Sequence, residues 1–316
     1  AGALRVSPDS ILNMQTPVGK EIGTAGYYAA TVDHSIRAEL TVTERTGMAR
    51  YTFSSKEKQG TVIIGGGVAA TSIQVAAIKI TGPHSCEGYA EGGAFCGIPT
   101  PYKVYFVAEF DADAESFGTW KEERLHANHT FAEGSHSGVY FTFPLKEGNQ
   151  AVQYKIGVSY VSVENARENL RVENPAWDFS AVRQATQDKW NEYLGKIEVE
   201  GDNEDRQMQF YTHLYRSLIH PNVCSDVNGE YMGADSQVHK TARKFYTSFS
   251  NWDTYRTQTA LIAMLAPEET SDIVMSHYLF AEQSGGGFPR WVLANIETGV
   301  MQGDPTPILV ANAYAF

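Results

Sequence analysis

The sequence predicts a multidomain β + α protein in which an antiparallel β-sandwich is followed by a helical linker and an α-helical toroid. Two observations support this prediction. The 316 residues of the chain exceed the roughly 150 of one ordinary domain, and the spacing of apolar residues changes along the chain. Apolar and polar residues alternate between residues 25 and 163, whereas beyond residue 178 apolar residues recur at helical spacing. We therefore expect two dissimilar cores, with the β core first.

The expected strands lie in the first half of the chain. β-branched and aromatic residues dominate the alternating runs, and Gly, Pro, Ser and Asn separate them, as is typical of a sandwich of many short strands. The runs are 28–32, 37–43, 49–53, 61–64, 72–80, 103–110, 139–143 and 152–163. They predict a β-sandwich domain over residues 1–176.

A helical linker is expected over residues 177–202. Asp178 stands where it can cap a helix with a one-sided apolar face, and Gly195 ends that helix. Asn203 precedes a second amphipathic helix, which Pro221 ends because proline cannot continue a helix. The second helix is expected to open the next domain.

Further helices are expected in that domain, over residues 203–316. Ser250 and Asp253 fit the S-x-x-D capping box of a helix that runs through Leu265. Pro267 occupies a favourable first-turn position of the helix after it. Successive helical hairpins of this kind predict the beginning of a toroid.

Charge and hydropathy exclude two classes of partner. The 25 Lys and Arg residues against 37 Asp and Glu residues leave a net charge of −12, and this field repels phosphate backbones. We therefore expect no nucleic acid partner. We expect no membrane partner either, because no apolar run approaches the roughly 20 residues that span a bilayer.

Two of the three cysteines, Cys86 and Cys96, flank a Gly-rich loop. Either the flexible loop lets the two thiols form a disulfide in an oxidising compartment, or they are two unrelated buried thiols. As a hypothesis, we expect Cys86 and Cys96 to be bridged in the secreted protein and Cys224 to be bonded to neither.

The densest group of chemically useful residues lies between Ser248 and Arg256. Trp252, Asp253 and Arg256 place an aromatic face, a carboxylate and a guanidinium within about one helical turn. A pyranose stacks its C–H face on indole, and its hydroxyls bond to carboxylate and guanidinium groups. Taken alone, however, the motif favours a structural interpretation, in which Asp253 completes the capping box and Trp252 belongs to the core.

A second cluster combines an aromatic residue and a carboxylate in the same way. Trp291 follows the glycines 285–287, and Asp304 lies in the loop before Pro305. Such loops at one end of a toroid are where a pocket is assembled. The alternative is that the glycines are helix stops and that Asp304 only complements a helix dipole.

The segment Asp226-Val227-Asn228-Gly229 is expected to form a β-turn. It lacks the full series of oxygen ligands and the distant Glu of a calcium loop. We therefore expect no metal site at this position.

Several stretches together resemble glycoside hydrolase family 92, and the resemblance covers nearly the whole chain. It is most specific between residues 190 and 312. The stretches are 26–28, 37–43, 50–53, 190–200, 210–211, 225–229, 252–256 and 303–304.

The resemblance implies a secreted, periplasmic or cell-surface exo-α-mannosidase that is calcium-dependent and inverting. It acts on terminal mannose of mannans or N-glycans, and an α-1,2 linkage is expected. The implied fold is a β-sandwich, a helical linker and the first helices of an (α/α)6 toroid. The family's N-terminal strands and later barrel segments are missing from this stretch, so the rest of the same polypeptide is expected to be required.

The resemblance also implies roles for individual residues. Trp252 and Asp253 would line the subsite of the terminal mannose, with Arg256, Trp291 and Asp304 as further substrate-binding candidates. An inverting hydrolase needs an acid and a base carboxyl roughly 6.5–9.5 Å apart, and both are expected beyond Phe316. Calcium would coordinate the O2 and O3 hydroxyls of mannose.

Two other functions remain open for the same fold. One is a glycosidase that cleaves mannose linked through a phosphodiester, where the phosphate leaving group needs little protonation. The other is a carbohydrate-binding protein without paired catalytic carboxyls. A continuation of the chain with two further pocket carboxylates would favour the enzyme.

Overall fold

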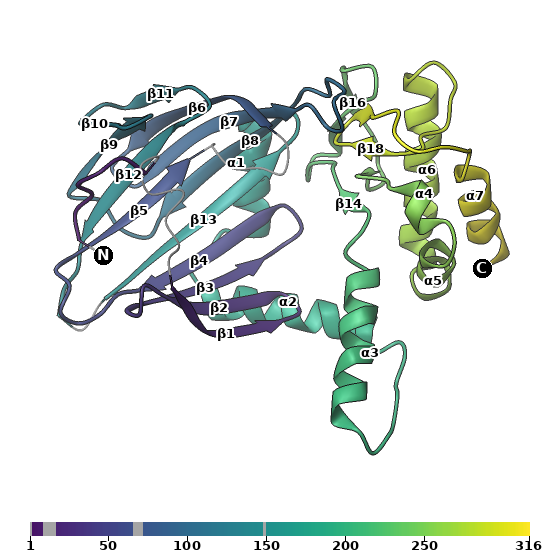
Figure 1. The fold of residues 1–316 in the computed structure, drawn as a ribbon, viewed down its shortest axis with the longest axis horizontal. Coiled ribbons are helices and arrows are strands. Elements are labelled where there is room, and N and C mark those ends of the chain that lie inside the picture. The colour runs from purple at the N-terminus through teal and green to yellow at the C-terminus, as the bar shows by residue number, and fades with distance from the viewer. Residues whose placement is uncertain (1, 9–16, 66–71, 148–149) are drawn as a thin grey trace. The chain divides into compact units, whose positions relative to one another are not determined.

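The computed structural model describes residues 2–8, 17–65, 72–147 and 150–316 (Figure 1). The chain divides into two compact units. Unit 1 contains residues 1–94 and 103–186, and unit 2 contains residues 95–102 and 187–316. The short segment 95–102 therefore belongs with the helices of unit 2, although it is embedded in the sequence of unit 1. The expected division at residues 176 and 202 remains a proposal.

Unit 1 is an antiparallel β-sandwich, which confirms the predicted fold class. A nine-stranded sheet in the order β1-β2-β3-β4-β13-β8-β7-β6-β11 is paired with a four-stranded sheet in the order β10-β9-β12-β5. The larger sheet consists of β1 (Val18–Thr24), β2 (Tyr27–Val32), β3 (Ile36–Val42), β4 (Thr46–Thr52), β6 (Ser72–Gly82), β7 (Ser85–Gly93), β8 (Tyr102–Phe110), β11 (Phe131–Glu133) and β13 (Ala151–Ser159). The smaller sheet consists of β5 (Gln59–Gly65), β9 (Ser116–Lys121), β10 (Arg124–Ala127) and β12 (Ser137–Pro144).

The core of the sandwich forms where the apolar faces of the two sheets meet. Phe110 of β8 packs on Phe141 of β12 with 4.9 Å between the ring centroids, so aromatic side chains join the two sheets. Phe106 and Ala108 belong to the same buried cluster. Val107 lies between them in the sequence and points to the opposite face, because side chains alternate along a strand.

A helix on that opposite face was not predicted. Helix α1 (Val163–Glu173) begins at the end of the run that we expected to continue as a strand to residue 163. The Ser162 hydroxyl caps it by accepting a hydrogen bond from the Asn165 amide at 3.1 Å. Leu170 of α1 packs against Val107, which explains why the helix is stable there.

Helix α2 (Phe179–Leu194) follows the prediction for the linker. The Asp178 carboxylate caps the helix by accepting from the Ala181 amide at 3.0 Å. Phe179 packs edge-on against Tyr27 of the large sheet. The division between the two units falls within this helix, after Thr186.

Unit 2 is built mainly from helices with three small two-stranded antiparallel sheets. Its helices are α3 (Glu204–Ser217), α4 (Asn251–Thr254), α5 (Gln258–Leu265), α6 (Pro267–Gln283) and α7 (Thr306–Ala315). Its strands are β14 (Asn222–Val223) with β17 (Tyr246–Thr247), β15 (Glu230–Met232) with β16 (Val238–Lys240), and β18 (Val292–Leu293) with β19 (Ile296–Glu297). The core includes Phe249, Ile262, Ile273, Phe280 and Val292. Among the helices of the described ranges, none combines the length and apolar character that a membrane crossing requires.

The single helix expected from Ser250 to Leu265 is wrong, because the chain breaks it into α4 and α5. Thr257 leaves the helical region with a φ of −145°. Ser250 makes no side-chain cap, and only its backbone carbonyl accepts from the Asp253 amide. The capping box is absent because Ser250 is paired like a strand residue with Trp291. The Asp253 side chain therefore does not serve in a capping box.

The expected bridge between Cys86 and Cys96 is also wrong, since all three cysteines are free thiols. Cys86 is fully buried in the sandwich core near the start of β7. At about 3.3 Å per residue, the extended strand carries the chain more than 20 Å away before Gly93. The three further residues to Cys96 span at most about 11 Å, too little to return.

The predicted turn at Asp226–Gly229 is confirmed. The Gly229 amide donates to the Asp226 carbonyl at 2.9 Å, and Gly229 has a φ of +83°. The Asn228 side chain accepts from the Glu230 amide at 2.9 Å. The geometry of the turn accounts for this Asn and Gly.

Candidate functional site

The candidate site begins with a hydrogen bond between two side chains far apart in the sequence. The indole Nε1 of Trp291 donates to Oδ2 of Asp253 at 3.3 Å. A strand-like pairing brings the two segments together, because Ser250 forms a bridge with Trp291. The Val292 amide donates to the Phe249 carbonyl at 2.8 Å and extends this pairing. The structure thus joins two residues that we predicted as substrate ligands from separate motifs.

An aromatic residue that the sequence analysis missed completes this cluster. The Phe95 ring stacks on the Trp291 ring, with centroids 4.8 Å apart and an interplanar angle of 17°. Phe95 lies in the segment 95–102 of unit 2, in a tight loop closed by the Ile98 amide donating to the Phe95 carbonyl at 3.0 Å. Cys96 and Gly97 both have positive φ there, 50° and 79°. An aromatic residue between glycines was the sequence signal that could have identified Phe95 as part of the site.

The backbone of Trp291 is fixed by a carboxylate that was also missed. Glu297 of β19 accepts from the Arg290 amide at 2.7 Å and from the Trp291 amide at 3.2 Å. The Thr298 amide donates to the Trp291 carbonyl at 2.9 Å. The hairpin β18–β19 therefore holds Trp291 in place before any ligand arrives.

Arg256, which we expect as a further substrate-binding residue, lies against two aromatic rings. Its guanidinium carbon lies 4.7 Å from the Trp252 ring centroid and 4.6 Å from the Tyr255 ring centroid. Arg256 also donates to the Trp252 carbonyl. The guanidinium is thus held against two aromatic rings and the backbone of α4, and it supports Trp252, which is half-buried.

Asp304 is exposed in the loop before α7, two residues before the helix begins at Thr306. The hydrogen-bonded cluster contains Asp253 and Trp291, with Phe95 stacked on the indole. Asp304 is not part of that cluster.

The cluster has the chemistry of a sugar-binding surface. Trp291 engages Oδ2 of the exposed Asp253, so Oδ1 is available to accept from a ligand hydroxyl. Aromatic rings beside a carboxylate suit the C–H face and the hydroxyl edge of a pyranose. Inverting hydrolysis needs two carboxyl groups in different roles, and this cluster contains a single carboxylate.

No calcium site is identified among the residues that the structure describes. In the described ranges, no three His, Cys, Asp or Glu side chains gather in a group that could hold a metal ion. No step of the chemistry is therefore assigned to calcium from this part of the chain.

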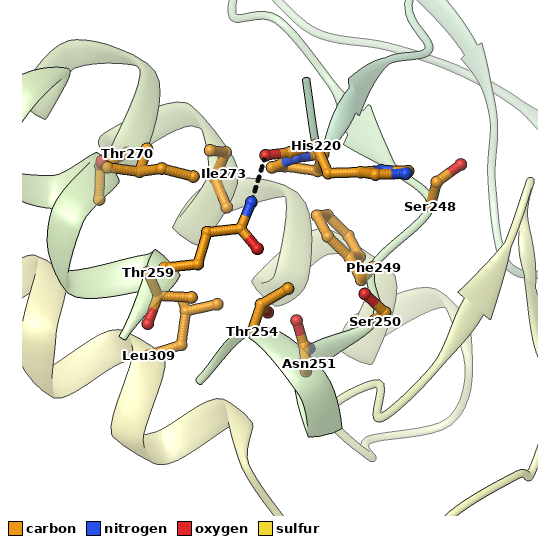
Figure 2. Close-up of a pocket in the computed structure, with 13 residues that line it drawn as sticks. His220, Ser248, Phe249, Ser250, Asn251, Thr254, Thr259, Thr270, Ile273 and Leu309 are labelled. Carbon is orange, nitrogen blue, oxygen red and sulfur yellow. Dashed lines mark hydrogen bonds between the residues drawn. The ribbon is translucent and has the colours of Figure 1, made fainter. Parts of the chain in front are cut away.

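A separate pocket lies within unit 2 (Figure 2). Its lining comes from the start of α4, from α5, from α6, from Leu309 of α7 and from His220. The Gln258 side chain donates to the His220 carbonyl at 3.3 Å. Neither Trp252 nor Asp253 lines this pocket, whereas Asn251 does, so it is distinct from the cluster around Trp291.

The β-sandwich followed by helices carries half-buried aromatic rings beside an exposed carboxylate, a combination suited to a carbohydrate-active protein. The glycosyl hydrolase family 92 N-terminal domain matches residues 5–159, and the glycosyl hydrolase family 92 catalytic domain matches residues 165–316. The chain belongs to glycosyl hydrolase family 92.

Solved structures and a curated relative agree with this membership. The chain is similar to a family GH92 α-mannosidase from Bacteroides thetaiotaomicron, with 25% identity and a TM-score of 0.85 over 94% of the chain and 41% of the relative. It is also similar to a family GH92 inverting mannosidase from Bacteroides thetaiotaomicron VPI-5482, with 25% identity and a TM-score of 0.87 over 100% of the chain and 42% of the relative.

The curated relative is an uncharacterized secreted glycosidase from Arthroderma benhamiae. It is 26% identical over 255 residues, which are 74% of this chain and 32% of the relative. The chain thus spans less than half the length of each of these relatives.

Proposed function

We propose that the chain is part of a secreted exo-α-mannosidase, which hydrolyses terminal α-linked mannose with inversion and prefers α-1,2 linkages. The observation that carries this proposal is the hydrogen bond from Trp291 to Asp253 at 3.3 Å, backed by the stacked Phe95 ring. Membership of the family and the similarity to two mannosidase structures support it. The name of the secreted fungal relative supports the location.

In this function Asp253 orients the terminal mannose. Its Oδ1 accepts a hydrogen bond from a sugar hydroxyl, while the indole N–H holds Oδ2 in place. The aromatic faces of Trp252, Trp291 and Phe95 receive the C–H face of the ring. Arg256 acts by holding Trp252. Asp304 is proposed as a peripheral contact on the neighbouring loop.

The proton transfers belong to groups outside this cluster. An inverting hydrolase needs one carboxyl to protonate the leaving oxygen and a second to activate water on the opposite face of the ring. We place both in the part of the protein beyond Phe316. Calcium is likewise proposed only from the family resemblance.

The proposal is tested with the full-length protein and α-1,2-linked mannobiose. Proton NMR of the first turnovers should show β-mannose, the product of inversion, before mutarotation. Initial α-mannose would contradict inversion. Binding of mannose without hydrolysis would favour a carbohydrate-binding protein, and cleavage only of mannosyl phosphodiesters would favour the phosphodiester-type glycosidase.

A further inference from the structure

A buried polar cluster lies directly behind the proposed sugar site. Asn251 is 1% exposed, whereas His277 and Thr306 are 0% exposed. The Asn251 amide nitrogen lies 2.9 Å from Nε2 of His277, 3.0 Å from Oγ1 of Thr306 and 2.9 Å from the Pro289 carbonyl. One side chain of α4 is therefore bonded to α6, to the start of α7 and to the loop before β18. Asn251 is among the labelled residues of Figure 2.

The amide nitrogen of Asn251 has two N–H groups for three nearby acceptors, so one N–H donates to His277 and the other is shared between Thr306 and the Pro289 carbonyl. Nδ1 of His277 donates to the Ile273 carbonyl at 2.8 Å, so Nε2 of the neutral imidazole accepts from Asn251. Oγ1 of Thr306 donates to the Pro289 carbonyl at 2.7 Å and accepts from Asn251. Burial lowers the pKa of His277 to about 4, which keeps the imidazole neutral at neutral pH.

The cluster touches both halves of the Asp253–Trp291 contact. Asn251 directly precedes Trp252 and Asp253, and its backbone amide donates to the Arg290 carbonyl at 3.1 Å. The Pro289 carbonyl that accepts from the Asn251 side chain lies two residues before Trp291. Any movement of Asn251 therefore changes the separation of the two segments. The contact from Trp291 to Asp253 is 3.3 Å long, so a small separation would break it.

Packing alone does not account for three buried polar side chains. Burying an amide, an imidazole and a hydroxyl is unfavourable unless all are hydrogen-bonded, and apolar residues of similar size would fill the same space. A fully bonded network, in contrast, fixes one arrangement of the segments that carry it. The neighbouring site formed by Asp253, Trp291 and Phe95 needs such a fixed arrangement to bind a sugar.

We propose that Asn251, held by His277 and Thr306, is a positioning residue of the sugar site. Its side-chain amide sets the separation between the segment of Trp252 and Asp253 and the segment of Trp291, and so sets the affinity for the terminal mannose. This inference rests on the proposed function, because it assumes that mannose binds at Asp253 and Trp291.

The test uses a matched set of buried hydroxyl variants in the full-length protein. Thr306→Val removes the hydroxyl that bonds to both Asn251 and Pro289, while Thr306→Ser keeps it. Thr270→Val is the control, since Thr270 is also buried but its hydroxyl bonds only to the Ala266 carbonyl in the first turn of α6. Asn251→Asp keeps the shape of the side chain and removes its two N–H donors.

Three readouts separate positioning from folding. The indole N–H signals of tryptophan, followed by NMR with Trp291→Phe to assign one of them, report the Trp291–Asp253 bond without any sugar. Calorimetric titration with mannoimidazole reports affinity, and thermal melting reports folding. We expect Thr306→Val and Asn251→Asp to shift the Trp291 signal and weaken binding about tenfold, a change of about 1.4 kcal/mol. Thr306→Ser should bind like the wild type, and Thr270→Val should lower only the melting temperature.

The outcomes distinguish this inference from the proposed function. An unchanged Trp291 signal and unchanged affinity in folded Thr306→Val and Asn251→Asp would overturn the positioning role. Equal loss of affinity in Thr270→Val would do the same, because it would assign the effect to general destabilisation. If the wild type binds no mannoimidazole, the proposed function fails, while the NMR signal still decides whether Asn251 positions Trp291.

Discussion

The Phe95 ring lies stacked on the indole of Trp291, at 4.8 Å between centroids, although the two residues are separated by most of the chain. This contact shows why the segment 95–102 belongs to unit 2 rather than to the sandwich whose strands flank it. A loop between β7 and β8 thus completes an aromatic wall beside Asp253.

Replacing Phe95 tests whether this wall contacts sugar. We expect Phe95→Ala to weaken the binding of mannoimidazole about tenfold, since an aromatic pair contributes about 0.5–1.5 kcal/mol beyond its buried area and the sugar loses a stacking face. Phe95→Tyr keeps the ring and should bind almost normally. Calorimetry on the full-length protein measures both. An unaltered affinity in Phe95→Ala would place the sugar elsewhere.

The free thiols make a prediction about chemical modification. Cys96 is exposed, whereas Cys86 and Cys224 are buried, and burial raises the pKa of Cys86 to about 12. In protein never exposed to reductant, we expect iodoacetamide to label Cys96 in the native state and Cys86 only after unfolding. Peptide mass mapping identifies the labelled sites. A Cys86–Cys96 disulfide-linked peptide would restore the bridge that the structure contradicts.

His277 makes stability depend on pH with a definite sign. Burial lowers the pKa of His277 from 6.5 to about 4. The imidazole therefore binds a proton below about pH 6.5 in the unfolded state, but only below about pH 4 in the folded state. The stabilising contribution is complete above pH 6.5 and is lost as the pH falls toward 4. Because of His277, we expect the free energy of unfolding to fall by about 2 kcal/mol between pH 7 and pH 5.

Denaturant unfolding of unit 2 at the two pH values measures this loss. In His277→Gln, the difference in the free energy of unfolding between the two pH values should be smaller by that amount. His84→Gln is the control, because His84 is exposed in unit 1 and bonded to Asp113, and it should behave as the wild type. An equal pH dependence in His277→Gln and wild type would show that His277 is not kept neutral by burial.

The sequence was sufficient to predict features set by local patterns. Alternation of apolar residues predicted the sandwich, and Asp178 at the start of an apolar period predicted α2, because caps and periods are properties of neighbouring residues. Helix α1 escaped prediction since its first residues extend an apolar strand run. Its stability comes from Leu170 packing on Val107, a contact that only the folded sheet provides.

The candidate site was predictable only in part, for the same physical reason. Trp252 and Asp253 are adjacent in the sequence, so their shared chemistry was visible. The partner of Asp253 is Trp291, and the partner of Trp291 is Phe95, and both pairings depend on tertiary structure. The pairing of Ser250 with Trp291 accompanies the loss of the expected capping box, which no local preference indicated.

The central claim is that Asp253 binds the terminal mannose, and the kcat/KM of Asp253→Asn in the full-length protein tests it most directly. We expect kcat/KM to fall by about 2–4 kcal/mol of transition-state stabilisation, roughly 30- to 1,000-fold, with an unchanged melting temperature. Asp272→Asn, which removes a carboxylate bonded to Arg243 in the same unit, should keep its kcat/KM. A kcat/KM in Asp253→Asn equal to that of the wild type would contradict the account.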